Sequence, residues 1–443
     1  MTRIPKIALL AGAAVLGLFL LCIVLAGLFF NPNDYKPAIE RWVEAQTGRS
    51  FTLDGELGWQ LWPHLAVTLP HTRLGPPTAF AGTDFAEWQQ ASISVRLWPL
   101  LQRRLELGEF RLRGLRLTLQ RDAQGRDNWQ DLLQLMTQNQ TPGRFRFGML
   151  AGLQIQDAQL QLRDELTQRA ITLQLATLQS DAVQFDQPVM LECTCRLHVA
   201  AGRQYLELPM QLTAQWQADQ AVQRLQLDLQ GTGQLRTEGL LAPLTITAPL
   251  PLAIALTSLS WQAGQQQLQV KSLRLEAGTA QLTGQLGATQ MNARPALVAS
   301  WQLAVPNLRQ WLQTLGVNVP ITRDATVLQH LQTALQLSGP ADDLHIQLSR
   351  MKLDQTRFEG EGRRLLSDGL PHYTFALHAD QLNLDRYLPA EVPKETTDSS
   401  RAAGTSVPIE WLRSLQAQGS LLIDRAQWQG ITARHLKIEL DGE

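Results

Sequence analysis

Apolar and polar residues alternate with a period of two along most of this chain, and this pattern limits its fold more than any other feature. The alternation begins at Phe51 and Leu53 and is most regular in the segments LQIQDAQLQLRDE (153–165) and RLQLDLQGTGQL (224–235). Successive side chains of a β-strand point to opposite faces, so each such segment is predicted to form a strand with one apolar and one polar face. Turn-forming residues separate the segments at intervals typical of antiparallel hairpins.

Few segments have helical spacing. The expected helices span residues 35–46, a short stretch after Asn128, residues 307–315 and residues 408–415. They are too few to cover the apolar faces of the strands, so either two sheets pack face to face or one long sheet curls and its apolar side lines a groove. Alternation over some 300 residues, without the breaks expected between sandwich domains of about 100 residues, favours the curled sheet. The expected fold is therefore mainly β, with one N-terminal transmembrane helix, a long curved antiparallel sheet that forms a groove, and a few short helices.

Two of the expected helices have a predicted apolar face. In the helix at residues 35–46, Ile39, Trp42 and Val43 share one face, and Gly48 ends the helix. Asn128 is expected to cap the next helix. The buried stripe predicted for that helix is Trp129, Leu132, Leu133 and Met136.

An uncharged apolar run from Ile7 to Phe30 precedes the alternating region. A helix of this length covers about 36 Å, enough to cross a bilayer core of about 30 Å. Arg3 and Lys6 precede the run, so the bias of basic residues toward the cytoplasm predicts a cytoplasmic N-terminus and an exported remainder. A cleavable signal peptide is the alternative, but its apolar region is usually only about 7–15 residues long. The expected anchor residues are Ile7, Leu10, Leu16, Leu20, Leu25 and Phe30, and the expected interfacial residues are Tyr35 and Trp42.

These features divide the chain into five expected segments. Residues 1–30 are a cytoplasmic stub and transmembrane anchor, and residues 31–48 are an interfacial amphipathic helix. Residues 49–390 are the exported β-groove, and the Thr- and Ser-rich residues 391–407 are a flexible linker. Residues 408–443 are a short helix and the start of a C-terminal β segment that is expected to be truncated.

Composition argues against several classes of protein. The 443 residues carry a net charge of -1, which gives no basic surface for nucleic acid. Cys22 lies in the apolar run, and Cys193 and Cys195 stand two residues apart. A strained disulfide and a zinc site with His198 are open alternatives for this pair, but two small apolar residues on one strand face is the favoured interpretation. No metal or cofactor is expected.

The search for catalytic motifs gives one weak match. The eight His residues are dispersed, and no metalloprotease pair or phosphate-binding loop occurs. Ser349 and Lys352 match the S-x-x-K nucleophile motif, which opens a helix, whereas Leu348, Met351 and Leu353 predict a strand here. We expect a protein that is not an enzyme.

A set of ordered motifs resembles those of the AsmA family. Residues 31–77 resemble its N-terminal module, residues 121–129 its G-x-x-N-W element, and residues 162–167 its Asp–Thr–Gly turn, with Gln168 in place of the Gly. Residues 306–320, Leu353–Asp354 and residues 384–389 match later sections in order, although family members usually continue beyond the segment that ends here. The resemblance implies a periplasmic protein anchored in the bacterial inner membrane, linked to outer-membrane biogenesis and similar to the repeating-β-groove lipid-transfer proteins.

The resemblance and the alternation together predict a lipid-handling groove. An acyl chain of about 15 methylenes costs roughly 12 kcal/mol to expose to water, and an apolar groove would remove most of that cost. Membrane phospholipid is the expected partner, at the anchor and through its acyl chains in the groove. Envelope proteins are further expected partners, because the alternative function is a non-catalytic assembly factor or scaffold for the targeting and insertion of outer-membrane proteins. The candidate groove-lining residues are Leu105, Leu107, Leu115, Leu117, Leu119, Leu153, Ile155, Leu160, Leu162, Leu173, Leu175, Leu225, Leu227 and Leu229.

Overall fold

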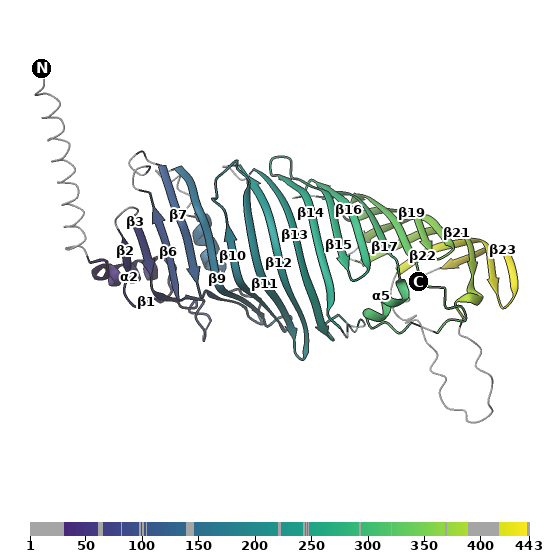
Figure 1. Ribbon diagram of the computed structural model, residues 1–443, viewed down its shortest axis with the longest axis horizontal. Helices are drawn as coiled ribbons and strands as arrows, with labels where there is room; N and C mark the ends of the chain where they lie inside the picture. The colour runs from purple at the N-terminus through teal and green to yellow at the C-terminus, as the bar shows by residue number, and fades with distance from the viewer. Residues whose placement is uncertain are drawn as a thin grey trace, which may run out of the picture. The chain divides into compact units, whose positions relative to one another are not determined.

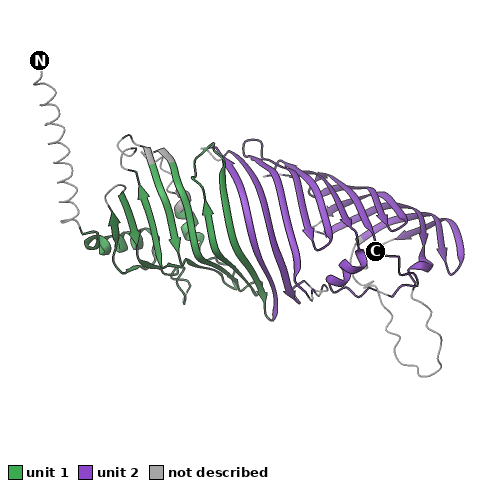
Figure 2. Ribbon diagram, viewed as in Figure 1, with its two compact units in different colours: residues 1–202 green, residues 203–443 purple. Residues whose placement is uncertain are grey.

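The structure is a computed structural model of the chain. It describes residues 31–60, 65–80, 82–96, 99, 102, 104–138, 146–219, 223–241, 244, 246, 248–291, 294–319, 321–367, 370–388 and 416–440. Within these residues the fold is mainly β, with 23 strands and a few short helices (Figure 1). Contacts divide the chain into two compact units, Met1–Gly202 and Arg203–Glu443 (Figure 2).

The described part of unit 1 begins with the helices η1 (Pro32–Tyr35) and α2 (Lys36–Thr47), close to the expected bounds. Gly48 ends α2 with a φ of 67°, a left-handed conformation that favours glycine. The strands that follow are β1 (Phe51–Asp54), β2 (Gly58–Gln60), β3 (Leu65–Leu69), β4 (His71–Leu74), β5 (Ala86–Trp88), β6 (Gln90–Val95), β7 (Arg104–Arg113), β8 (Arg116–Arg121), β9 (Arg146–Asp164), β10 (Arg169–Ser180) and β11 (Val189–Ala201). The helix α4 (Gln130–Gln138) lies between β8 and β9 in the chain.

The apolar residues of α2 do not share one face as expected. Ile39 and Val43 pack on the hydrophobic cluster of β1, but Trp42 is 65% exposed, so the prediction that it shares their face was wrong. The carboxylates of Glu40 and Glu44 accept hydrogen bonds from backbone N–H groups of β1, at 2.9 and 3.4 Å. The side of α2 that meets the sheet is therefore the side of these two glutamates, and Trp42 points to solvent.

The sheet is mostly antiparallel, as expected, but three strand pairs among the described residues are parallel. The 19-residue β9 pairs in parallel with β7 along its first part and with β8 along its second, and antiparallel with β10. In unit 2, β21 and β22 are also parallel. A parallel pair needs a long crossover, which α4 and its flanking residues supply between β8 and β9. Strand alternation looks the same in both kinds of pairing, so the sequence pattern did not reveal these crossovers.

The start of α4 is tied to β8 and to the end of α2. Asn128 is 1% exposed, and its side chain accepts a hydrogen bond from Gln120 N at 2.9 Å and donates one to Thr118 O at 3.0 Å. The buried guanidinium of Arg49 donates to both oxygens of the Asp131 carboxylate, at 2.6 and 3.1 Å. One predicted buried position of this helix was wrong, because Leu133 is 54% exposed.

Unit 2 is a meander of long strands. From β12 to β21 each strand pairs antiparallel with the next, and β23 is antiparallel to β22. The helix α5 (Leu308–Thr314) follows β17 and matches the expected helix, with the side chain of Asn307 accepting a hydrogen bond from Gln310 N at 3.0 Å. The helix η2 (Leu384–Arg386) follows β21. The strands are β12 (Gln204–Ala218), β13 (Arg224–Glu238), β14 (Leu250–Gln262), β15 (Gln267–Ala277), β16 (Ala280–Thr289), β17 (Ala296–Val305), β18 (Leu331–Pro340), β19 (Asp343–Leu353), β20 (Thr356–Ser367), β21 (Leu370–Asn383), β22 (Gln416–Trp428) and β23 (Ile431–Leu440).

Three expected segments lie outside the described residues: the anchor at Ile7–Phe30, the linker at 391–407 and the helix at 408–415. Among the residues that are described, no helix combines the length and the apolar character needed to cross a bilayer.

Candidate apolar ligand-binding face

The strand register of unit 2 sorts its side chains onto two faces. Paired residues of neighbouring strands point to the same side of a sheet, so they form rows across it. One row is Gly284, Trp301, Leu335, Leu348, Gly360 and Leu377, and the next is Leu286, Ala299, Leu337, Ile346, Gly362 and Phe375. We call the side with these rows the apolar face, and the opposite side the polar face.

Many leucines of the apolar face are only half-buried. In β13, Leu225, Leu227 and Leu229 are half-buried, while the alternating Gln226 and Gln230 are exposed. The strands of unit 2 make their main contacts with their neighbours in the sheet, and among the described residues no second sheet packs on the apolar face. This face is therefore open over much of its extent.

Two adjacent hollows lie on the apolar face. The first has a volume of about 390 Å³ and the second about 240 Å³, and Leu335 borders both. The first is lined by Leu273, Leu275, Leu282, Trp301, Leu303, Thr333 and Leu335. The apolar residues that line the second are Leu335, Ile346, Leu348, Tyr373, Phe375 and Leu377. Aliphatic and aromatic side chains dominate both linings, which suits a hydrocarbon ligand.

The wall of the first hollow depends on a glycine. A Cβ atom at Gly284 would overlap the indole of Trp301 and the carbonyl of Ser300 on the neighbouring strand. The absence of a side chain at this position lets the Trp301 ring lie against the backbone of β16.

The helix α5 seals another part of the apolar face. Leu308 is 8% exposed and packs with Val305 and Ala280, and Leu315 packs with Leu250. Trp311 contacts both clusters, and its indole N–H donates a hydrogen bond to Ala277 O at 2.9 Å. The apolar face thus has a sealed region under α5 and an open region that contains the two hollows.

Eight of the predicted groove-lining residues share one face of unit 1. The register places Leu117 beside Leu160, and Leu160 beside Leu173. The eight residues are Leu117, Leu119, Leu153, Ile155, Leu160, Leu162, Leu173 and Leu175. Leu225, Leu227 and Leu229 lie on the apolar face of unit 2. The contact of these residues with a ligand stays a prediction.

The remaining predicted residues are placed differently. Leu115 lies between β7 and β8, outside a strand. Leu107 lies in β7 and pairs with Leu150 of β9. The register of β7 with β9 shifts between Leu105 and Glu106, close to this pair. Leu105 lies in β7, and its side chain is outside the description.

Cys193 and Cys195 are buried free thiols on the same face of unit 1 as the eight residues above. Burial and the neighbouring Cys195 raise the pKa of Cys193 to about 12, so its thiol stays protonated. No group of residues that could hold a metal occurs in the described part of the chain. Burial of both thiols on one strand face agrees with the favoured interpretation of two small apolar side chains.

Asp354, one of the residues that resemble the family motifs, holds three segments together through hydrogen bonds. Backbone N–H groups of Leu328, Gln329 and His330 donate to the Asp354 carboxylate at 2.7, 2.8 and 3.1 Å, and the Tyr387 hydroxyl donates to it at 3.0 Å. Burial opposes ionisation of Asp354, but these hydrogen bonds hold its pKa below the usual range. Burial, followed by the bond to Asp354, raises the pKa of Tyr387 to about 12. Asp354 therefore links the turn after β19 to residues 328–330, which precede β18, and to Tyr387, which follows η2.

The weak catalytic motif lies in a strand. The pairing of β18 with β19 shifts by one residue around Ser349, so this residue sits in a β-bulge. The S-x-x-K motif places its serine at the start of a helix, and Ser349 does not have that setting.

Comparison with known proteins agrees with these features. The model of the AsmA family matches residues 1–408. This chain belongs to the AsmA family. Protein AsmA of Escherichia coli (strain K12) is 30% identical over 113 residues, which cover 24% of this chain and 18% of that protein. No solved structure gives a significant match.

The aromatic lining of the hollows was missed at the sequence level. Trp301, Tyr373 and Phe375 follow the same alternation as the predicted leucines. The period of two could have placed them on the apolar face, but it gives no order of importance among some 300 alternating residues. Only the register shows which of them meet around Leu335.

Proposed function

We propose that this AsmA family protein holds acyl chains of membrane phospholipid on the apolar face of its sheet and takes part in outer-membrane biogenesis. The observation that supports this function best is the open apolar face, with two adjacent hollows lined by leucines and aromatic side chains. Membership of the AsmA family also supports a role related to outer-membrane biogenesis.

The physical reason is the cost of hydrocarbon in water. At about 0.8 kcal/mol per methylene, exposing an acyl chain of about 15 methylenes to water costs roughly 12 kcal/mol of free energy. A chain laid on the apolar face would cover both itself and the half-buried leucines, and water would leave both surfaces. Such contact is non-directional, so it needs continuous apolar rows and no catalytic group.

The proposed setting is the bacterial envelope, with Ile7–Phe30 as a single-pass inner-membrane anchor and the rest of the chain in the periplasm. The apolar run ends at Phe30, directly before Asn31, the residue that caps η1. Glu40 and Glu44 turn toward β1, and the exposed residues of this region include the aromatic Tyr35 and Trp42 and the basic Arg41, beside the acidic Asp34. Exposed aromatic and basic side chains suit the headgroup region of a bilayer.

The amount of phospholipid that co-purifies with the full chain tests this function. The protein is extracted gently, and bound phospholipid is measured per mole of protein by mass spectrometry. Leu335→Asp places a charge where the two hollows meet, and Gln336→Asp places the same charge on the next residue, which faces the opposite side.

We expect bound phospholipid in the wild type, a severalfold decrease in Leu335→Asp and no change in Gln336→Asp. Equal amounts in the two variants would contradict the proposal. A wild-type protein that carries no phospholipid but crosslinks to outer-membrane proteins would favour a scaffold instead.

A further inference from the structure

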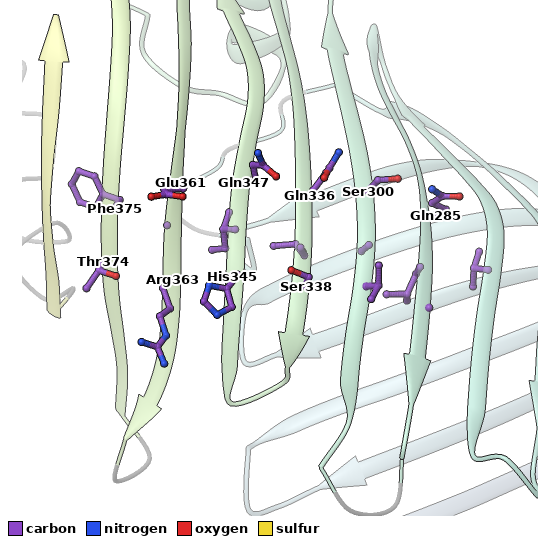
Figure 3. Close-up of a pocket in the computed structure, with 18 of the residues that line it drawn as sticks. Gln285, Ser300, Gln336, Ser338, His345, Gln347, Glu361, Arg363, Thr374 and Phe375 are labelled. Atoms are coloured by element: carbon purple, nitrogen blue, oxygen red, sulfur yellow. The ribbon is translucent and has the colours of Figure 1, made fainter.

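The polar face of unit 2 carries a hollow of its own. Its volume is about 1000 Å³, and its lining residues lie on β15 to β21 (Figure 3). Its polar side chains alternate along the strands with the apolar rows, which places it on the side of the sheet opposite to the two apolar hollows. Figure 3 shows polar side chains on successive strands around it. One row of paired residues crosses five strands, from β16 to β20, and consists of Gln285, Ser300, Gln336, Gln347 and Glu361.

Polar residues make up about half of the lining and carry almost no net charge, and the apolar lining residues include Leu286, Leu337 and Ile346. Glu361 is its one acidic residue and Arg363 its one Lys or Arg. The Arg363 guanidinium already donates to both oxygens of the Asp343 carboxylate, at 2.6 and 2.8 Å. Phosphate groups are bound by several available cations, and metal ions by several carboxylates. A neutral polar ligand fits this lining better than either.

The carboxamides of the row are available for a ligand. Within the described part of the chain, the side chains of Gln285, Gln336 and Gln347 are exposed and make no hydrogen bond to another residue. Each carboxamide offers two donors and one carbonyl acceptor. A sugar hydroxyl both donates and accepts, so it can bond to a carboxamide in either direction.

The spacing of the row fits a linear chain of sugars. Neighbouring strands lie about 4.8 Å apart, so five strands from β16 to β20 span about 19 Å. One strand spacing is close to the length of one pyranose residue in an extended glycan, so successive rings would meet successive side chains. Val298, which is 65% exposed at the edge of the row, offers an apolar surface to the C–H groups of a ring.

We propose that this hollow binds an extended, uncharged glycan whose chain runs across β16 to β20. The site uses the face opposite to the one proposed for acyl chains, so either proposal can fail without the other.

Binding of defined oligosaccharides to the full chain tests this site. The protein is kept in a detergent that has no sugar headgroup, and chitopentaose, cellopentaose and maltopentaose are titrated by calorimetry and by saturation-transfer NMR. The test variant is Gln336→Ala combined with Gln347→Ala. The matched control is Gln332→Ala, on the same strand and the same face as Gln336 but outside the hollow. All three positions are exposed, so neither variant disturbs the folded sheet.

We expect at least one of the three oligosaccharides to bind. Loss of two hydrogen-bonding side chains should weaken its affinity about tenfold in the double variant, and the control should bind like the wild type. Absence of binding for all three, or equal affinity in the wild type and the double variant, would overturn the proposal. Binding of a capped extended peptide in the hollow, with no oligosaccharide binding, would overturn it as well.

Discussion

Truncation of a leucine should have very different effects on the sealed and the open regions of the apolar face. Leu308 of α5 is 8% exposed and packs against Val305 of β17 and Ala280 of β16, so Leu308→Ala should lower the free energy of unfolding by about 2–5 kcal/mol. Leu335 is half-buried and already borders two hollows, so Leu335→Ala loses only part of the transfer free energy of a leucine. At about 25 cal/mol per Å² of apolar area, that loss should be below about 1.5 kcal/mol.

Urea unfolding of the full chain, followed by far-ultraviolet circular dichroism in one detergent, measures both losses. Gln332→Ala on the polar face is the control and should stay within about 0.5 kcal/mol of the wild type. Equal destabilisation by Leu308→Ala and Leu335→Ala would refute the reasoning, because it would mean that Leu335 is packed as tightly as Leu308 is between α5 and the sheet.

Acid should destabilise unit 2, because hydrogen bonds from Thr326 and then Arg386 lower the pKa of Asp324 to about 2. The folded pKa lies below the unfolded value, so this stabilisation is complete above about pH 4 and is lost as the pH falls toward about 2. Urea midpoints across this range should fall less in Asp324→Asn than in the wild type, and parallel curves would contradict the assignment. Asn128→Ala should cost about 2–4 kcal/mol by urea unfolding, because it leaves the Gln120 N–H and the Thr118 carbonyl unpaired; a cost like that of the exposed Gln124→Ala would count against this. Trp42→Ala should lower the free energy of unfolding in urea by less than about 0.5 kcal/mol, because Trp42 is exposed, whereas Ile39→Ala should lower it by clearly more. The opposite order would contradict the orientation of α2 described above.

The class of fold and most of the strands could be predicted from the sequence. The period of two is a local property of the backbone, so segments such as residues 224–235 reveal both a strand and its two faces. Helix ends with strong local signals, such as Gly48 and Asn307, were also predictable.

Features that depend on long-range pairing could not be predicted. The parallel pairs of β9 with β7 and β8 depend on where the chain returns after α4. The exposed side of α2 depends on Glu40 and Glu44 meeting backbone donors of β1, which periodicity does not encode. Both are tertiary effects that override a local pattern.

The sequence predicts that an apolar face exists, but not where on that face the hollows lie. Alternation predicts an apolar face, but the register decides that β15 to β18 meet in one hollow and β18 to β21 in the next, with Leu335 between them. The polar hollow was not foreseen, because exposed Gln residues occur throughout the chain and only the structure shows where they surround a cavity.

Photocrosslinking from neighbouring residues tests the central claim most directly. Leu335 and Gln336 are adjacent in β18 but face opposite sides of the sheet, so a photoreactive amino acid at each position samples one face from the same strand. In membranes that contain labelled phospholipid, a crosslink to lipid is expected at position 335 and none at position 336. Equal labelling at both positions, or none at position 335, would contradict an apolar face that holds acyl chains.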